Sequence, residues 1–205
     1  MIYIWTIPTN YKNKAIGEYD RKVSPESHLL MQGRILLSEE FKEPAEVNFE
    51  ISKDAILKFD CLPNNAPAPL VNERIKNVLE LHAPNDVQFV KAKLNCKDGV
   101  LDGYYYLNLT QTIVGIDHEK SFCIKLKVGD LEFINGFNYL FYLKDCMGKH
   151  KLARDKEFKP HLLVDESIKN IFDKEKITGV RFARPEEYYK GPLTPDDLIA
   201  EHSND

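Results

Sequence analysis

Hydrophobic side chains recur at a helical spacing in two separate stretches of the sequence, residues 70–90 and 163–183. In each stretch they stand at intervals i, i+4, i+7 and i+8, at Val71, Ile75, Val78 and Leu79 and at Val164, Ile168, Ile171 and Phe172. Such a stripe is typical of a helix that buries one face. We therefore predict one amphipathic helix in each stretch.

The polar residues around these stripes predict where each helix begins and ends. Asn72 and Asp165 stand where an N-cap is needed, because a short side-chain oxygen accepts a hydrogen bond from an unpaired N–H of the first turn. Pro84 and Gly179 follow the stripes, as expected where a helix must stop. A strand should come next, and in the first stretch residues 88–94 alternate so that one face is apolar and the other carries lysines.

The two stretches align without a gap over 21 positions, eight of them identical. The identical pairs are Leu70 and Leu163, Val71 and Val164, Glu73 and Glu166, Ile75 and Ile168, Lys76 and Lys169, Asn77 and Asn170, Val87 and Val180, and Phe89 and Phe182. Two ordinary amphipathic helices can resemble each other by chance, but the shared polar residues argue for a duplicated helix-strand module. The duplication predicts pseudo-symmetry within one body.

The remaining pattern is dominated by short strands. Residues 2–7, 34–37, 47–51 and 56–61 are apolar or alternating runs, so residues 1–62 should form a β-rich N-terminal part. Three prolines in residues 63–69 predict a stiff connection, either a domain boundary or a loop within one domain.

The middle of the chain predicts two hairpins. Asp98-Gly99 and Asp102-Gly103 lead into a strand at 104–109, and Asn135-Gly136 separates apolar runs at 131–134 and 137–143. Residues 122–128 also alternate like a strand. We predict an α+β fold of mostly antiparallel sheets, with two pseudo-equivalent helix-strand modules and few other helices.

These elements predict a division into the β-rich part, the connection, a body at 70–185 and an acidic tail at 186–205, together one compact domain. The tail contains a possible helix start at Thr194. With 43% hydrophobic residues the chain has enough apolar surface for a proper core.

Composition narrows the class of partner. The 28 basic and 32 acidic side chains leave a net charge of −4, so no overall field attracts nucleic acid. The densest basic stretch, residues 144–159, also carries acids and is expected to be a solvated surface. No apolar run has membrane length, and the first residues lack the pattern of a secretion signal, so a cytoplasmic protein without membrane contact is expected.

One polar cluster attracts attention for catalysis. Residues 117–121, Asp-His-Glu-Lys-Ser, contain an acid, a base and a hydroxyl, although neighbours in sequence do not make a triad and a polar turn explains them equally well. Cys146 and His150 have a ligand spacing without a second pair, and the four cysteines are widely spread. We expect no metal and no cofactor. Tyrosines at 104–106 are candidates for interface anchors or for core.

Several segments together resemble a family of bacterial immunity proteins from polymorphic toxin systems, formerly catalogued as a domain of unknown function. They are residues 34–38 (RILLS), 70–79 (LVNERIKNVL), 104–108 (YYYLN), 116–121 (IDHEKS), 152–154 (LAR), 164–169 (VDESIK) and 179–182 (GVRF). The resemblance covers most of the chain and is weakest in the first 30 residues and the tail. Asn72 and Asp165 replace the serine expected at the helix starts, which leaves the caps intact.

The resemblance implies a protein that binds and neutralises a toxin delivered by a neighbouring cell, and it carries over no catalytic residues. The candidate contact residues are Tyr104, Tyr106, Asp117, His118, Glu119 and Arg154. The leading hypothesis is thus a cytoplasmic, non-enzymatic binder of a cognate toxin. The alternative is an enzyme or small-ligand-binding protein that uses a cleft near residues 117–121.

Overall fold

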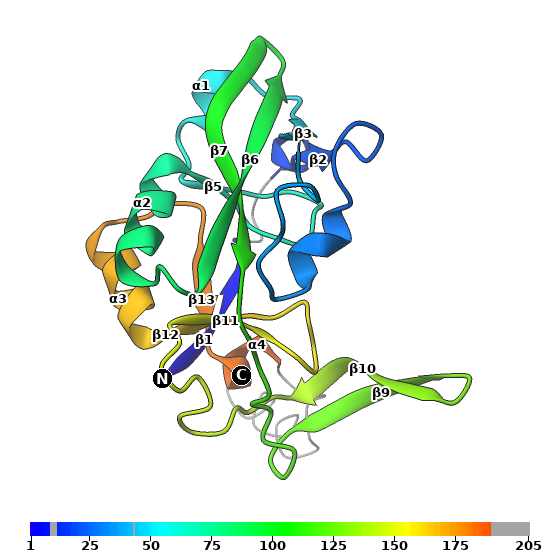
Figure 1. Ribbon diagram of the computed structural model, residues 1–205. Coiled ribbons are helices and arrows are strands. Elements are labelled where there is room, and N and C mark those ends of the chain that lie inside the picture. The colour runs from blue at the N-terminus through cyan, green and yellow to red at the C-terminus, as the bar shows by residue number, and fades with distance from the viewer. Residues whose placement is uncertain (9–11, 43, 190–205) are drawn as a thin grey trace, which may run out of the picture.

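The computed structural model describes residues 1–8, 12–42 and 44–189, and the strands of these residues form three sheets (Figure 1). The largest sheet has the order β2 (Glu18–Tyr19), β3 (Ala45–Asn48), β6 (Val87–Cys96), β7 (Gly99–Leu109), β5 (Leu70–Asn72) and β4 (Cys61–Leu62). The second has the order β13 (Arg181–Ala183), β1 (Ile2–Thr6), β12 (Leu162–Asp165), β11 (Leu152–Asp155) and β8 (Thr112–Ile113). The third is a hairpin of β9 (Phe122–Val128) and β10 (Leu131–Tyr139).

The described residues contain few helices, and these are short. They are α1 (Lys53–Ile56), α2 (Glu73–His82), α3 (Glu166–Lys174) and α4 (Pro185–Tyr188), with 3-10 turns η1 (Asn13–Ala15) and η2 (Ser27–Met31). Most strand pairs are antiparallel, and β3 with β6 and β11 with β8 are parallel. The expected α+β class is therefore confirmed. None of the helices in the described ranges combines the length and apolar content that a membrane span requires.

Each duplicated stretch folds as strand, helix and strand, with a third strand inserted between the two. In the first module β5, α2 and β6 enclose β7, and in the second β12, α3 and β13 enclose β1. The registers correspond, because Val71 faces Tyr105 as Val164 faces Tyr3. Both modules also have an equivalent outer strand, β4 beside β5 and β11 beside β12. The duplication is therefore visible in four strands of each large sheet.

The predicted caps hold both helices at their starts. The Asn72 side chain accepts a hydrogen bond from the Ile75 N–H at 3.2 Å, and the Asp165 carboxylate accepts one from the Ser167 N–H at 3.0 Å. The helices lie together on one side of the molecule (Figure 1) and their apolar stripes enter one core. That core includes Ile75, Leu79, Ile168 and Phe172 and is shared by both modules.

The two halves interlock through reciprocal contacts. The Thr178 N–H, in the loop after α3, donates to the Asp60 carboxylate next to β4 at 2.8 Å. In the other direction the Lys151 N–H, next to β11, donates at 2.7 Å to the carboxylate of Asp86 in the loop after α2. Each module is thus fixed at its end by the segment that leads into the other module.

The structure corrects several local predictions. Residues 34–37 are not a strand, and residues 56–61 contain the end of α1 and the start of β4 instead of one strand. Asn135-Gly136 is a bulge inside β10, because the hairpin turns at Gly129-Asp130. Within the segment 144–159, predicted to be solvated, β11 is buried at every position. The residues 63–69 connect β4 and β5, which pair with each other, and the tail from residue 190, with Thr194, lies outside the described residues.

A candidate partner-binding surface

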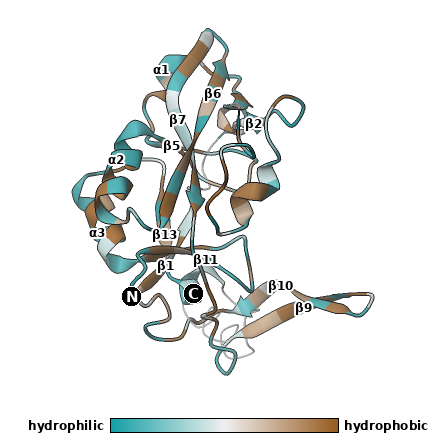
Figure 2. Cartoon of the chain, in the orientation of Figure 1, coloured by the Kyte–Doolittle hydropathy of each residue, from teal (hydrophilic) through white to brown (hydrophobic). Residues whose placement is uncertain are grey.

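The hairpin of β9 and β10, called the arm from here on, projects away from the rest of the molecule (Figure 1). Its outward-facing apolar residues are Phe122, Ile124, Leu126 and Val128 on β9 and Leu131 and Phe133 on β10, each between 42% and 64% exposed. Alternation along the strands puts the four β9 residues on one face, where Val128 pairs with Leu131 and Leu126 with Phe133. Figure 2 shows much of this projecting hairpin as hydrophobic. The arm therefore offers a continuous apolar face to solvent.

The opposite face of the arm packs against the core near the body and is polar farther out. Near the body, Cys123, Ile134 and the buried Phe137 pack against the core around Leu140 and Leu163. Farther out, the same face is polar, and the Lys125 ammonium bonds the Glu132 carboxylate at 2.8 Å. Packing at the base and polarity at the tip fix which face of the arm is free.

The polar cluster at residues 117–121 forms the turn that begins the arm. The Asp117 carboxylate accepts hydrogen bonds from the N–H groups of Glu119 and Lys120 and pairs with the Lys120 ammonium at 3.0 Å. The hydrogen bond from Lys120 is the main reason that the pKa of Asp117 lies below its ordinary value. The Ser121 hydroxyl accepts from the Phe141 N–H at 2.9 Å and so joins the two stems of the arm.

The cluster does not assemble an acid, a base and a nucleophile around one point. His118 turns to the Glu157 carboxylate, 2.7 Å from its Nε2, while the Asp117 carboxylate turns to Lys120 and the Ser121 hydroxyl to the main chain of Phe141. In a catalytic triad the nucleophile contacts the base, and the base in turn contacts the acid. The observed contacts are those of a structural turn, with the side chains of His118 and Glu119 exposed beside the arm.

Two of the tyrosine candidates lie inside the protein. Tyr104 is 3% and Tyr106 0% exposed, and both pack in the core of the large sheet. The Tyr104 hydroxyl donates to the carbonyl of Phe59 at 3.2 Å, and burial raises the pKa of Tyr104 to about 12. A partner that docks on the surface does not reach either ring in this conformation.

Arg154 is also buried, at 0% exposure in the centre of β11. Its guanidinium donates to the carbonyl oxygens of Leu30 (2.9 Å), Pro67 (3.3 Å) and Lys159 (2.6 Å). Burial lowers the pKa of Arg154 to about 10, which leaves the group charged at neutral pH. Arg154 therefore joins three segments of the chain, η2 and the loops at Pro67 and Lys159, from within. Of the six candidate contact residues, only His118 and Glu119 present exposed side chains.

A chain of hydrogen-bonded ionisable groups, buried at Asp155 and His161 and half-buried at Tyr142 and Tyr189, runs beside Arg154. The Tyr142 hydroxyl lies 2.5 Å from the Asp155 carboxylate and 3.1 Å from His161 Nδ1, and His161 Nε2 lies 2.7 Å from the Tyr189 hydroxyl. Burial raises the pKa of Asp155 and lowers that of His161 to about 4. Aromatic rings of Phe137 and Phe158 pack against the imidazole, so the chain belongs to the core.

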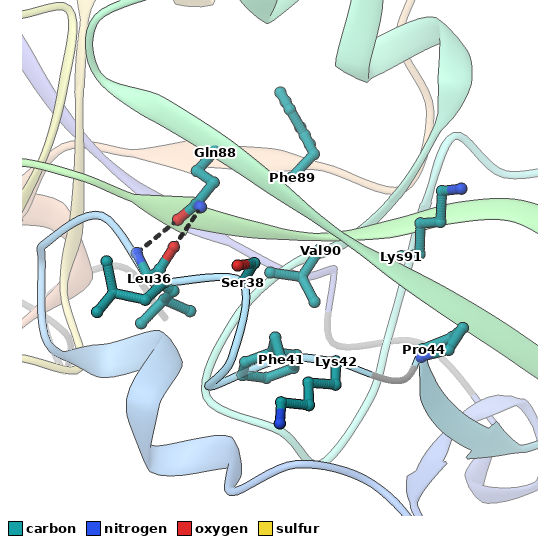
Figure 3. A pocket seen from close by; sticks show the side chains of 10 residues that line it. Leu36, Ser38, Phe41, Lys42, Pro44, Gln88, Phe89, Val90 and Lys91 are labelled. Atoms are coloured by element: carbon teal, nitrogen blue, oxygen red, sulfur yellow. Dashed lines mark hydrogen bonds between the residues drawn. The ribbon is translucent and has the colours of Figure 1, made fainter.

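A surface pocket of about 300 Å³ lies between residues 36–42, with Pro44, and β6 (Figure 3). Gln88 fixes its edge, because its side chain exchanges two 2.8 Å hydrogen bonds with the main chain of Leu36. Phe41 and Val90 line the pocket, and the ammonium groups of Lys42 and Lys91 point away from each other. Among the described lining residues, no catalytic groups converge. Across the described ranges, no group of three or more His, Cys, Asp or Glu residues is placed to hold a metal ion.

Comparison with known proteins identifies the family of this chain. No curated protein sequence matches the chain. A family model matches residues 2–186, a span that includes both modules, the arm and the Asp117 turn. The chain belongs to the Immunity protein family (Imm11).

Proposed function

We propose that this protein binds and neutralises a cognate bacterial toxin in the cytoplasm by protein–protein contact, without catalysis of its own, and that the outer face of the arm is the contact surface. Membership of the immunity protein family supports the role. The exposed apolar face of the arm supports the proposed location of the contact surface. The proposal rests on this observation.

Large apolar patches with polar borders on soluble proteins commonly mark interaction sites. The outer face of the arm has this form, with aromatic Phe122 and Phe133 among aliphatic neighbours and exposed His118 and Glu119 beside its base. Buried aromatic side chains usually supply most of the affinity of an interface, and polar rim residues mainly adjust association rate and specificity. We assign Phe122, Leu126 and Phe133 as anchors and His118 and Glu119 as rim residues.

The test is an affinity measurement with the toxin domain encoded by the gene adjacent to that of this chain. Leu126→Asp places a charge in the centre of the outer face, and we expect it to weaken binding by at least about 30-fold, the loss typical of a central anchor. Leu81→Asp is the matched control, since Leu81 is 74% exposed on α2, away from the arm. Both variants should keep the melting temperature of the parent protein, because both side chains are exposed.

Equal affinity of the two variants for this toxin domain would contradict the arm as the contact surface. Absence of binding by the parent protein, with no protection of cells that express the toxin domain, would contradict the function itself. The two failures are therefore distinguishable.

Stoichiometry separates a binder from an enzyme. A protein that covers its target inhibits at a one-to-one molar ratio, whereas a catalyst that destroys the toxin or its product acts below that ratio. We expect the residual toxin activity to reach its floor at one equivalent of this protein. Complete inhibition at a tenth of an equivalent would favour the enzymatic alternative.

A further inference from the structure

The two outer edges of the arm differ. In β10 the register shifts between Ile134 and Gly136 and again between Phe137 and Tyr139, so each site inserts an extra residue. In β9 all seven residues from Phe122 to Val128 are continuous. Within the described residues β10 is the only strand that pairs with β9. Bulges commonly prevent further pairing at a strand edge. The outer edge of β9 is therefore regular, whereas that of β10 is interrupted by bulges.

The turn of the arm determines which main-chain groups face outward. Val128 and Leu131 face each other across the two-residue turn Gly129-Asp130, and the pair that closes such a turn is hydrogen-bonded. Because ladder bonds alternate along an antiparallel pair, Leu126 also bonds toward β10. The N–H and C=O groups of Lys125 and Lys127 then point to the free edge.

The lysines on the polar face of the arm determine which kind of strand can pair with the free edge of β9. Lys125 bonds Glu132, while Lys127 has no carboxylate within ion-pair distance among the described residues. A strand added to this edge would place its own side chains beside both lysines. Pairing of β9 with a second copy over its full length would put Lys125 opposite Lys125, and like charges directly opposite destabilise a sheet. A strand with acidic residues on that face avoids the repulsion.

We propose that the edge of β9 accepts an extended segment of the toxin whose residues alternate between apolar, continuing the outer face, and acidic, facing Lys125 and Lys127. This inference rests on the proposed function and specifies how the toxin is held. Main-chain hydrogen bonds provide the affinity in such strand addition, and alternate side chains provide the specificity.

The test removes one outward N–H. Lys127→Pro deletes the donor at the free edge and leaves the bonds to β10 in place, and proline is tolerated on edge strands. Lys127→Ala is the matched control, because it removes the same charge and keeps the N–H. With the toxin domain of the adjacent gene, we expect Lys127→Ala to weaken binding by no more than about fivefold. Lys127→Pro should weaken it by at least about a further tenfold.

Amide hydrogen exchange gives the second readout. Formation of the complex should protect the N–H groups of Lys125 and Lys127, while that of Leu126 is already protected in the free protein. Equal binding of the proline and alanine variants, or unprotected Lys125 and Lys127 amides in the complex, would overturn strand addition. If Leu126→Asp still abolished binding, the proposed function would stand. Protection that appears without toxin would also overturn the inference, because the edge would then be filled by a second copy or by the chain itself.

Discussion

Gly179 passes so close to Cys61 that a β-carbon on Gly179 would collide with the Cys61 carbonyl oxygen. The contact lies where the loop after α3 meets the start of β4, and the Cys61 N–H donates there to the Thr178 carbonyl at 3.1 Å. Gly179 also has φ +79°, a conformation that costs other residues about 1–2 kcal/mol. Gly179 therefore meets two requirements at once, a positive φ in the loop after α3 and a close approach to the main chain of β4.

Replacement of Gly179 by alanine should destabilise the protein by more than about 2 kcal/mol, because backbone strain and collision act together. Gly103→Ala is the control, since Gly103 has φ +86° and open space around its α-carbon. We expect the control to cost about 1 kcal/mol, so that denaturant unfolding separates the two variants. Similar free energies of unfolding would show that the contact with Cys61 relaxes.

The buried His161 should make stability depend on pH. Its pKa is lowered by burial from 6.5 to about 4, so between these pH values the unfolded chain binds a proton that the folded chain does not. The contribution of His161 to the free energy of unfolding is therefore fully present above pH 6.5. As the pH falls toward 4, up to about 3 kcal/mol of this free energy is lost. The measurement is the free energy of unfolding at a series of pH values.

The neighbouring Asp155 acts in the opposite direction, because a raised pKa lets the folded state bind a proton before the unfolded state does. A difference measurement isolates the histidine. His161→Gln should remove the part of the slope between pH 6.5 and 4 that belongs to His161. Parallel pH profiles of parent and variant would show that the pKa of His161 is the same in the folded and unfolded states.

Arg154 should affect stability and leave toxin affinity unchanged. Arg154→Met leaves three carbonyl oxygens without their donor, and each unsatisfied buried group costs about 1–3 kcal/mol. Arg154→Lys keeps the charge but cannot reach all three acceptors, so we expect it to be destabilising too. Both effects appear in thermal unfolding. A variant that stays as stable as the parent but loses toxin affinity would instead make Arg154 a direct contact.

The two modules should respond alike to equivalent substitutions. The Lys76 ammonium lies 5.5 Å from the centre of the Tyr105 ring, and that of Lys169 lies 5.5 Å from the Tyr3 ring. Each lysine also bonds an acid four residues later. Lys76→Met and Lys169→Met should each cost about 1 kcal/mol, and their effects should add in the double variant. Strong non-additivity would show that the modules are coupled at these positions.

Local signals in the sequence predicted the modules because caps, stripes and alternation act over a few residues. Asn72 and Asp165 cap their helices as predicted, but the second helix ends at Lys174, and Lys176 (φ 52°), not Gly179, takes the left-handed conformation directly after its C-cap. The hairpin of β6 and β7 was predicted from the turn residues between them. The pairing of β7 with β5 and that of β1 with β12 and β13 were not predicted, because pairing between strands distant in sequence leaves no mark in either segment. Asn135-Gly136 is a typical turn sequence, but Gly129-Asp130 takes the turn and leaves it as a bulge.

The candidate surface was harder to predict for a physical reason. Alternation in residues 122–128 predicted a strand, yet apolar side chains that face a partner have the same pattern as those that face the core. Arginine and tyrosine are likewise frequent both at interfaces and in satisfied interior positions, so the sequence did not place Arg154 or Tyr106. Burial separates these cases, and burial depends on the complete fold.

Among the residues that the structure describes, the arm meets the rest of the protein at its base, where Ser121 binds the Phe141 main chain and Phe137 enters the interior. Side chains along its outer face therefore contribute little to folding, and substitutions there preserve the scaffold. An engineer who wishes to give this scaffold a new binding target would vary the six apolar positions of the outer face and keep the residues that pack beneath them.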